Sequence, residues 1–254
     1  MNYSTLFAVY LLAISCKIND HEISDRREKF SQAPIPGRIK DIPLPEGYER
    51  IAPDENSFGE WMRGIRLKKD NHVYLYNGSL KKNQVAQFAV LDITVGKKDL
   101  QQCADAVMRL RAEYLFDEER YDEIVFKDNN SKSYAWNEGS NKKNFTNYLE
   151  RVFACCGTAS LEKQLKPVDL QSMQPGCVFI KGGFPGHAML VADMAVNKKG
   201  MKIFLLAQSY MPAQDIHVVK NPLHEKLSPW YELDGINEIV TPEWTFYTNQ
   251  LRKF

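Results

Sequence analysis

The sequence predicts an α+β fold in which a helix that carries Cys103 packs on an antiparallel sheet. The first half of the chain holds the helical signals, because residues 100–114 are mostly strong helix formers without glycine or proline. After residue 175 the sequence changes to short apolar runs separated by turn residues, which is typical of strands. Helices in one half and strands in the other indicate the α+β class.

Each predicted element follows from a local signal. Ser57 is the expected N-cap of a helix over residues 58–65, and Glu60 completes a capping box with it. Asp99 and Gln102 form a similar pair before the helix that carries Cys103. The other predicted elements are strands over 73–76, 87–95, 124–126, 177–180, 187–193 and 202–208, a loop over 128–144 and a helix over 144–155.

Length and charge limit the classes of protein to consider. The chain has 254 residues, 44% of them hydrophobic and 26% charged, which suits one large globular domain. Its 33 basic and 32 acidic residues leave a net charge of +1, so no nucleic-acid partner is expected. We expect a single α+β domain over residues 41–254. Residues 17–40 are polar and contain Pro34 and Pro36, so they predict a tether.

The N-terminus indicates export. Residues 6–14 are apolar but too few to cross a bilayer as a helix. The stretch Leu12-Ala-Ile-Ser-Cys16 is similar to a bacterial lipobox, so we expect residues 1–16 to be a signal peptide that ends at a lipidated Cys16. Lipidation implies a membrane partner through the acyl chains and a location in the cell envelope. A signal peptide without lipidation and a stray apolar terminus remain alternatives.

Cys103 is the first candidate for catalysis. It lies in the opening turn of its predicted helix, where free N–H groups and the helix dipole favour a thiolate. The alternative interpretation is structural, because Cys103 shares a helix face with Val107, Leu110 and Tyr114. A cysteine on such a face is often a small buried hydrophobe.

His187 is the expected general base, at the start of a predicted strand. Gln208, a polar residue that ends an apolar strand, is the leading candidate to orient the imidazole, and Asp193 is the second. Gln102 could add an N–H to an oxyanion site, although a role in helix capping is the simpler explanation. No CxxC pair or HExxH motif occurs, so neither a metal site nor a cofactor is expected.

Four further residues are candidates for binding substrate. The glycines before His187, Gly186 among them, would let an extended substrate approach the backbone. The loop directly after Gln208 carries Tyr210, Gln214 and Asp215, and loops at strand ends often hold functional side chains.

Two resemblances add to this interpretation. The first is carried by segments that include Ser57-Phe-Gly-Glu-Trp61, Asp99-Leu-Gln-Gln-Cys-Ala-Asp-Ala106, Phe179-Ile-Lys-Gly-Gly-Phe-Pro-Gly-His-Ala188, Leu205-Leu-Ala-Gln-Ser-Tyr-Met-Pro-Ala-Gln-Asp215 and Thr241-Pro-Glu-Trp-Thr-Phe246. Through them the chain resembles, over residues 42–254, domain of unknown function 4846, a family common among Bacteroidetes lipoproteins. The order of Cys103, His187 and Gln208 is similar to that of NlpC-type papain-like peptidases, with Pro175-Gly176-Cys177 at the position of their Gly-Asp turn.

The second resemblance implies a papain-like core and an exported cysteine hydrolase that cleaves amide bonds. Its expected substrate is a peptidoglycan peptide or another amide. The alternative class is a surface lipoprotein without catalysis, a binding or scaffold domain in which Cys103 and His187 are buried in the core.

Overall fold

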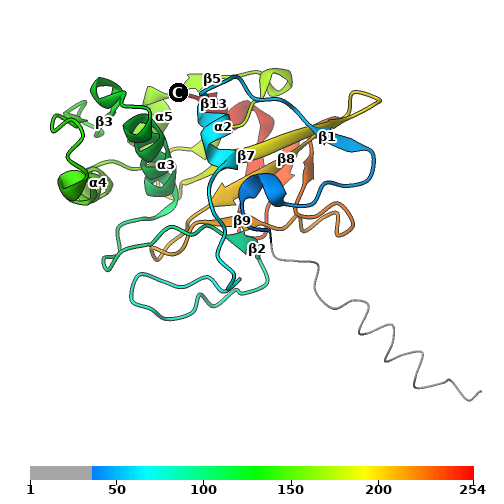
Figure 1. Ribbon diagram of the computed structural model, residues 1–254, viewed down its shortest axis with the longest axis horizontal. Helices are drawn as coiled ribbons and strands as arrows, with labels where there is room; N and C mark the ends of the chain where they lie inside the picture. Colours follow the sequence, from blue (N-terminus) through cyan, green and yellow to red (C-terminus); the bar gives the residue numbers. More distant parts are fainter. Residues whose placement is uncertain (1–35) are drawn as a thin grey trace, which may run out of the picture. The chain divides into compact units, whose positions relative to one another are not determined.

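The computed structural model describes residues 36–254 (Figure 1). The predicted signal peptide, Cys16 and residues 17–35 of the predicted tether lie outside the described residues. The prediction of a tether was wrong for residues 36–40. Ile39 begins a short 3-10 turn, η1 (Ile39–Asp41), and is 1% exposed. Its N–H donates to the carbonyl of Ile65, so this stretch belongs to the folded unit.

An antiparallel sheet of nine strands forms the centre of the unit, and together with the helices it confirms the α+β class. Its main path runs through β2 (Gln87–Val90), β9 (His217–Val219), β8 (Lys202–Gln208), β7 (His187–Asn197), β6 (Val178–Lys181), β13 (Leu251–Lys253) and β5 (Lys166–Pro167). Two more strands, β1 (Tyr48–Arg50) and β10 (Tyr231–Glu232), pair with β7 and β8. Two small hairpins are separate, β3 (Val125–Lys127) with β4 (Ser133–Ala135) and β11 (Glu238–Val240) with β12 (Thr245–Tyr247).

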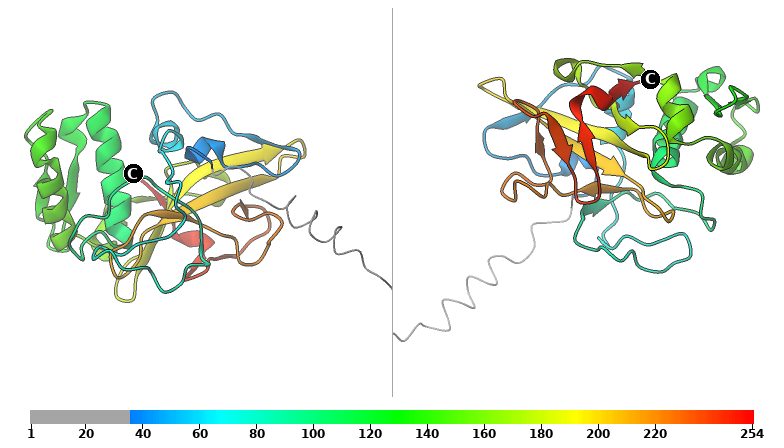
Figure 2. Two further views of the ribbon diagram at one scale, coloured as in Figure 1. Left: turned by 60° about the horizontal axis from the view of Figure 1, so that its bottom comes forward. Right: turned by 180° about the vertical axis from the view of Figure 1, so that it is seen from behind.

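Four α-helices accompany the sheet: α2 (Phe58–Arg63), α3 (Cys103–Asp117), α4 (Lys142–Cys155) and α5 (Thr158–Gln164). Short 3-10 turns lie at η2 (Tyr121–Glu123), η3 (Leu170–Ser172) and η4 (Thr248–Gln250). Figure 2 shows α3 and α4 side by side at one end of the sheet, and α3 contacts β7. The helix with Cys103 therefore packs on an antiparallel sheet, as the sequence predicts.

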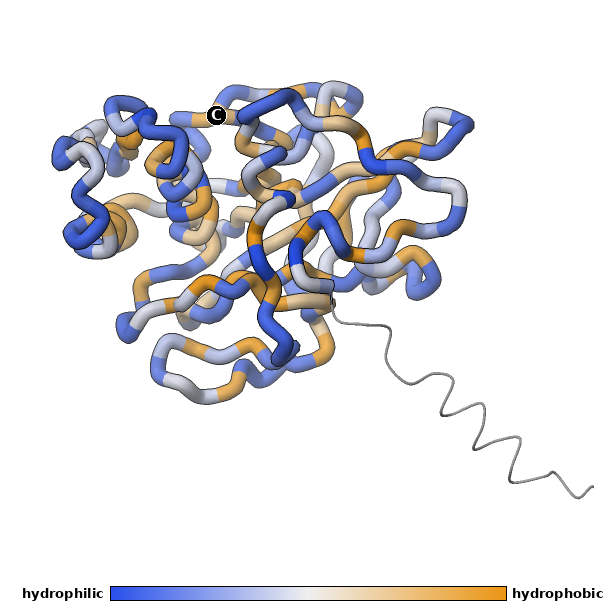
Figure 3. The backbone as a smooth tube through the Cα atoms, in the orientation of Figure 1, coloured by the Kyte–Doolittle hydropathy of each residue, from blue (hydrophilic) through white to orange (hydrophobic). Residues whose placement is uncertain are grey.

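The longest strand, β7, is buried on both faces, because each face supports a different part of the core. Ala188, Leu190 and Ala192 pack with the apolar residues of α3. Met189 and Val191 point the other way and pack under the β11–β12 hairpin. Successive side chains of any strand point to opposite faces. Because both faces are buried here, the residues on both are mostly apolar, and the central strands have the hydrophobic colour in Figure 3.

Local predictions and structure differ mainly at element ends. The predicted strand 87–95 ends at Val90, because Leu91 turns to hydrogen-bond with Ile216 outside the regular pairing. The helix predicted from residue 100 begins at Cys103. The predicted strand 73–76 makes only isolated bridges, Tyr74 with Leu80 and Leu75 with Gln214. The predicted cap at Ser57 is confirmed, because its hydroxyl accepts the N–H of Glu60.

Candidate functional site

Cys103 and His187 line the same cavity, which has a volume of about 460 Å³. Four segments build its walls: the start of α3, the stretch from the last turn of α4 to the first residue of α5 (all of 153–158 except Cys155), residues 183–187 up to the first residue of β7, and the Tyr210–Met211 pair. Trp244, from the turn of the β11–β12 hairpin, completes the lining. Segments that are far apart in the sequence therefore meet around Cys103 and His187, the two residues predicted from the sequence.

Cys103 is the first residue of α3 and is 8% exposed. Burial raises the pKa of its thiol to about 11, and the neighbouring Asp105 carboxylate adds to the rise. The backbone N–H groups of Ala104 and Ala188 act in the opposite direction, as expected at a helix start. The expectation of a populated thiolate was therefore wrong, because desolvation outweighs the helix terminus.

His187 is 1% exposed, and burial lowers the pKa of its imidazole to about 4. The ring lies among three aromatic rings, with centroids 4.8 Å from Tyr210, 5.4 Å from Trp244 and 5.8 Å from Phe246. Near neutral pH the imidazole is therefore neutral and able to accept a proton.

The resting thiol and imidazole are two neutral groups and not an ion pair. Within residues 36–254 no hydrogen bond joins the Cys103 sulfur to the His187 ring, although both line one cavity. The groups that favour the Cys103 thiolate are instead backbone N–H groups, among them that of Ala188, the residue that follows His187. Catalytic contacts in ligand-free sites are often loose and tighten when substrate binds.

Gln208 contacts His187 as the sequence predicts, with 2.7 Å between Nε2 of the ring and Oε1 of the amide. The side-chain N–H₂ of Gln208 donates to Glu243 Oε2 over 2.8 Å. Lys81 donates to the same carboxylate oxygen over 2.7 Å. These contacts form a continuous series of four hydrogen-bonded side chains that ends at His187: Lys81, Glu243, Gln208 and His187. We call this series the polar chain.

The polar chain determines which ring nitrogen of His187 carries the proton. A carboxylate only accepts hydrogen bonds, so Glu243 holds the N–H₂ of Gln208 on its own side. The amide oxygen then faces His187, and Nε2 of the ring must donate to it. In the neutral imidazole this leaves Nδ1 with the free lone pair.

His217 agrees with the same orientation of the amide. Its Nδ1 lies 2.9 Å from the carbonyl oxygen of Asp215, which only accepts, so Nδ1 carries the proton. Its Nε2 is then an acceptor, 3.3 Å from the N–H₂ of Gln208. Burial lowers the pKa of His217 to about 3, so this ring is also neutral.

Sequence reasoning missed Glu243 and Lys81. Lys81 is 7% exposed, and Glu243 lies in the turn of the β11–β12 hairpin. Burial lowers the pKa of Lys81, and its contact with Glu243 opposes that change. Neither residue lies in a recognisable motif. The two are 162 positions apart, so no local sequence pattern could predict that they form a pair.

Residues 39–141 and 128–253 match the family model described as domain of unknown function 4846. The chain belongs to this family. No curated protein and no solved structure matches the chain. The family description assigns no function. Among residues 36–254, no group of three or more His, Cys, Asp or Glu side chains is arranged to hold a metal, and no helix is long and apolar enough to span a membrane.

Three of the predicted binding residues in this member of the 4846 family line the cavity. Gln102 is the N-cap of α3, and its side chain donates to Asp99 over 3.2 Å. The capping contact differs from the predicted one, because the Gln102 N–H donates to Asp105. Tyr210 lies against the His187 ring. Gly186 is required for close packing within the chain, since a Cβ there would come within 2.4 Å of the carbonyl oxygen of Gly183.

The remaining predicted residues have structural roles. Gln214 is 1% exposed and is absent from the cavity lining. Asp215 is buried, pairs with Lys68 over 2.8 Å and accepts the N–H of Tyr74, so it fixes the 68–74 segment. Both were predicted to contact substrate; the loop after Gln208 instead turns inward after Met211. Asp193, the second candidate to orient His187, is fully buried in ion pairs with Arg50 and Arg63.

The pKa of Cys103 predicts how its reactivity depends on pH. Alkylation requires the thiolate, and below a pKa of about 11 the thiolate fraction rises tenfold per pH unit. The rate of Cys103 alkylation by iodoacetamide should therefore still be rising at about pH 10, where an ordinary thiol has levelled off. Peptide mapping by mass spectrometry measures this rate, with the exposed Cys155 of the same protein as reference. A Cys103 rate that levels off below about pH 8 contradicts the raised pKa.

Proposed function

We propose that the protein is a cysteine hydrolase of the papain-like type, which cleaves amide bonds through the Cys103 thiol. One observation carries the proposal: a cysteine at a helix start and a histidine with a defined tautomer line one cavity. Gln208 supplies the orienting group that such a pair requires. The chain order of cysteine, histidine and amide residue supports the papain-like type.

The reaction starts from the neutral pair. As the sulfur attacks the carbonyl carbon, Nδ1 of His187 accepts the thiol proton, and the carbonyl oxygen gains the negative charge. When the C–N bond breaks, His187 returns this proton to the leaving amine, and the acyl group stays on sulfur as a thioester. Water, deprotonated by His187, then attacks the thioester carbonyl; the C–S bond breaks, His187 returns the proton to the sulfur, and a carboxylic acid leaves the site.

The start of α3 offers donors for the developing oxyanion. The N–H groups of Cys103 and Ala104 have no acceptor within the first helical turn, as at every helix start. Gln102 lines the same cavity, and its N–H₂ group has one hydrogen beyond its bond to Asp99. Two such donors stabilise a tetrahedral oxyanion by several kcal/mol, on the order of 10²–10³ in rate for each.

The cavity lining favours an uncharged scissile region. It contains two aspartates, Asp99 and Asp105, and neither lysine nor arginine among the described residues. Burial raises the pKa of Asp105 well above its usual value, which reduces its negative charge. A cell-wall peptide is the proposed substrate, cleaved where the groups beside the amide are neutral. Anchoring in the cell envelope through Cys16 belongs to the same proposal, and membrane fractionation of Cys16→Ala tests it.

The test of the function is cleavage of muropeptide digests by wild type, Cys103→Ala and Cys103→Ser. Wild type should release new amino groups, and both variants should lose at least about 10³ in rate, because alanine has no nucleophile and the serine hydroxyl is a much weaker one than the thiol. Cys155→Ala is the matched control, since Cys155 is exposed and outside the cavity. Cleavage by Cys103→Ala at the wild-type rate would exclude the proposed nucleophile.

The competing function is a binding or scaffold domain without catalysis. It is favoured by the two neutral, unlinked groups, because a buried neutral cysteine and histidine are stable in a core. Under this alternative Cys103→Ala changes nothing beyond a small loss of stability. Absence of a thioester intermediate, sought by mass spectrometry after acid quenching of wild type with the digest, would support it.

A further inference from the structure

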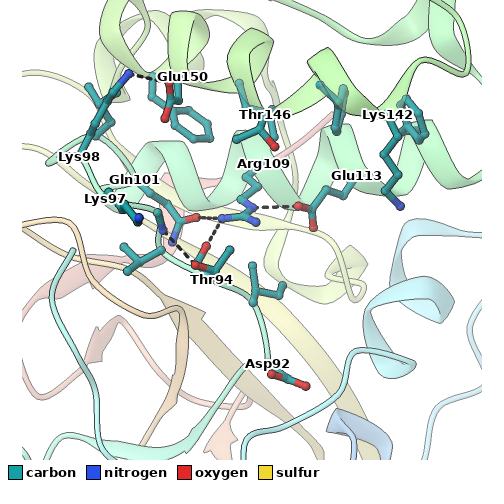
Figure 4. A pocket seen from close by; sticks show the side chains of 18 of the residues that line it. Asp92, Thr94, Lys97, Lys98, Gln101, Arg109, Glu113, Lys142, Thr146 and Glu150 are labelled. Atoms are coloured by element: carbon teal, nitrogen blue, oxygen red, sulfur yellow. Dashed lines mark hydrogen bonds and ion pairs between the residues drawn. The ribbon is translucent and has the colours of Figure 1, made fainter. Parts of the chain in front are cut away.

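A second cavity, of about 410 Å³, adjoins the one that holds Cys103. It lies between α3, α4 and the loop of residues 92–98 (Figure 4). Leu100 and Phe153 line both cavities, so these two side chains form the partition between them. Both are only partly buried.

One side of the second cavity is apolar. Phe116 from α3 and Phe145 and Leu149 from α4 form its deep side, and each keeps less than a tenth of its surface exposed. Ile93 and Val95 face it from the loop. An apolar side of this kind can bury part of a small ligand, while polar and charged residues line the rest of the cavity.

Most charged side chains around this cavity already form ion pairs or hydrogen bonds within the protein. Arg109 donates to Glu113 over 2.8 Å, to the carbonyl of Thr94 and to the side chain of Gln101, as Figure 4 shows. Lys98 pairs with Glu150 over 2.8 Å. A ligand anion would have to break the Arg109 contacts.

The outer rim carries the remaining charges in water. Lys142 lies 3.9 Å from Asp117, and both side chains are largely exposed. Lys97 is also exposed at the rim. Exposed charges of mixed sign contribute little to binding, so recognition by this cavity depends on its apolar wall.

We propose that the second cavity is a subsite for an uncharged hydrocarbon group on the acyl side of the amide substrate. The group passes the Leu100–Phe153 partition while the scissile carbonyl lies at Cys103. The catalytic part rests on the proposed function; the binding of a hydrocarbon group beside Cys103 does not. Burying each CH₂ group contributes about 0.8 kcal/mol, roughly a factor of four in affinity.

The probes are three amides of 7-amino-4-methylcoumarin, with acetyl, octanoyl and ω-carboxyoctanoyl acyl groups. Wild type should cleave the octanoyl amide with a KM at least about tenfold below that of the acetyl amide. The ω-carboxylate removes this gain, because the charge would enter an apolar wall.

Thr146→Trp fills the subsite from its surface. Thr146 is an exposed residue of α4 that lines the second cavity, so a larger side chain there spares the core (Figure 4). KM for the octanoyl amide should rise at least about tenfold, with the acetyl amide unchanged. Asn147→Trp is the matched control, because Asn147 is the next exposed residue on α4 and lines neither cavity.

Titration calorimetry of the octanoyl amide into the Cys103→Ala protein measures binding to the subsite in the absence of cleavage. Binding that Thr146→Trp abolishes, with no cleavage by wild type, supports the subsite and overturns the hydrolase. Equal KM values for the acetyl and octanoyl amides overturn the subsite and leave the hydrolase standing. Absence of both binding and cleavage of the octanoyl amide also overturns the subsite.

Discussion

Replacing Glu243 by glutamine is expected to lower turnover by on the order of 10²–10⁴. Glu243 acts only through Gln208, so it is a positioning residue. A neutral amide at position 243 either donates or accepts, so the N–H₂ of Gln208 is then held only by the 3.3 Å contact with His217 Nε2 and can turn toward His187. Nε2 of the ring would become the acceptor and Nδ1 would take the proton, which removes the base from the thiol.

Nitrogen NMR of the histidine rings measures the tautomer directly and needs no substrate. In wild type His187 should show a protonated Nε2 and a bare Nδ1, and Glu243→Gln should show both tautomers. Glu238→Gln is the matched control, because Glu238 is an exposed residue of the same hairpin. Retention of the wild-type tautomer in Glu243→Gln would exclude this role.

The same substitution has a cost in stability that must be measured separately. Lys81 is 7% exposed and would lose its counter-charge. Breaking a buried ion pair from one side costs roughly 3–5 kcal/mol of unfolding free energy. Turnover is therefore compared per folded molecule. The double variant Lys81→Met/Glu243→Gln removes the stranded charge, so it should regain stability but not turnover.

Asp193→Ala is expected to lower the unfolding free energy by roughly 3–5 kcal/mol and to leave turnover per folded molecule unchanged. The Asp193 carboxylate is fully buried, and its two oxygens pair with Arg50 over 2.8 Å and with Arg63 over 2.5 Å. Through these pairs it joins β1 and α2 to β7. Its removal leaves two arginines partly buried without a partner, and no part of the polar chain changes.

Urea unfolding measures the loss, with Asp122→Asn as control at an exposed carboxylate. The Arg50 pair contributes less of this loss in unfolding free energy, because Arg50 is 23% exposed and solvent screens its charge. A stable Asp193→Ala protein with turnover lowered on the order of 10²-fold or more would make Asp193 the orienting residue in place of Gln208.

Local patterns in the sequence predicted the frame of the site correctly. Alternation along residues 187–193 and 202–208 places His187 and Gln208 on inward faces, and the two strands are neighbours in the sheet. The residues around Cys103 predicted a helix start to within a few positions. These features are predictable because helix caps and strand alternation depend on residues close together in the chain.

The tertiary structure alone decided the chemistry of these groups. The pKa values of Cys103 and His187 follow from burial under segments distant in sequence, which reversed the thiolate expectation. Gln208 alone does not define a tautomer; Glu243 does, from the hairpin turn, with Lys81 behind it. The pKa values depend on desolvation, and the tautomer depends on which neighbouring groups donate and which accept hydrogen bonds. Both are properties of the surroundings in space, which only the folded chain brings together.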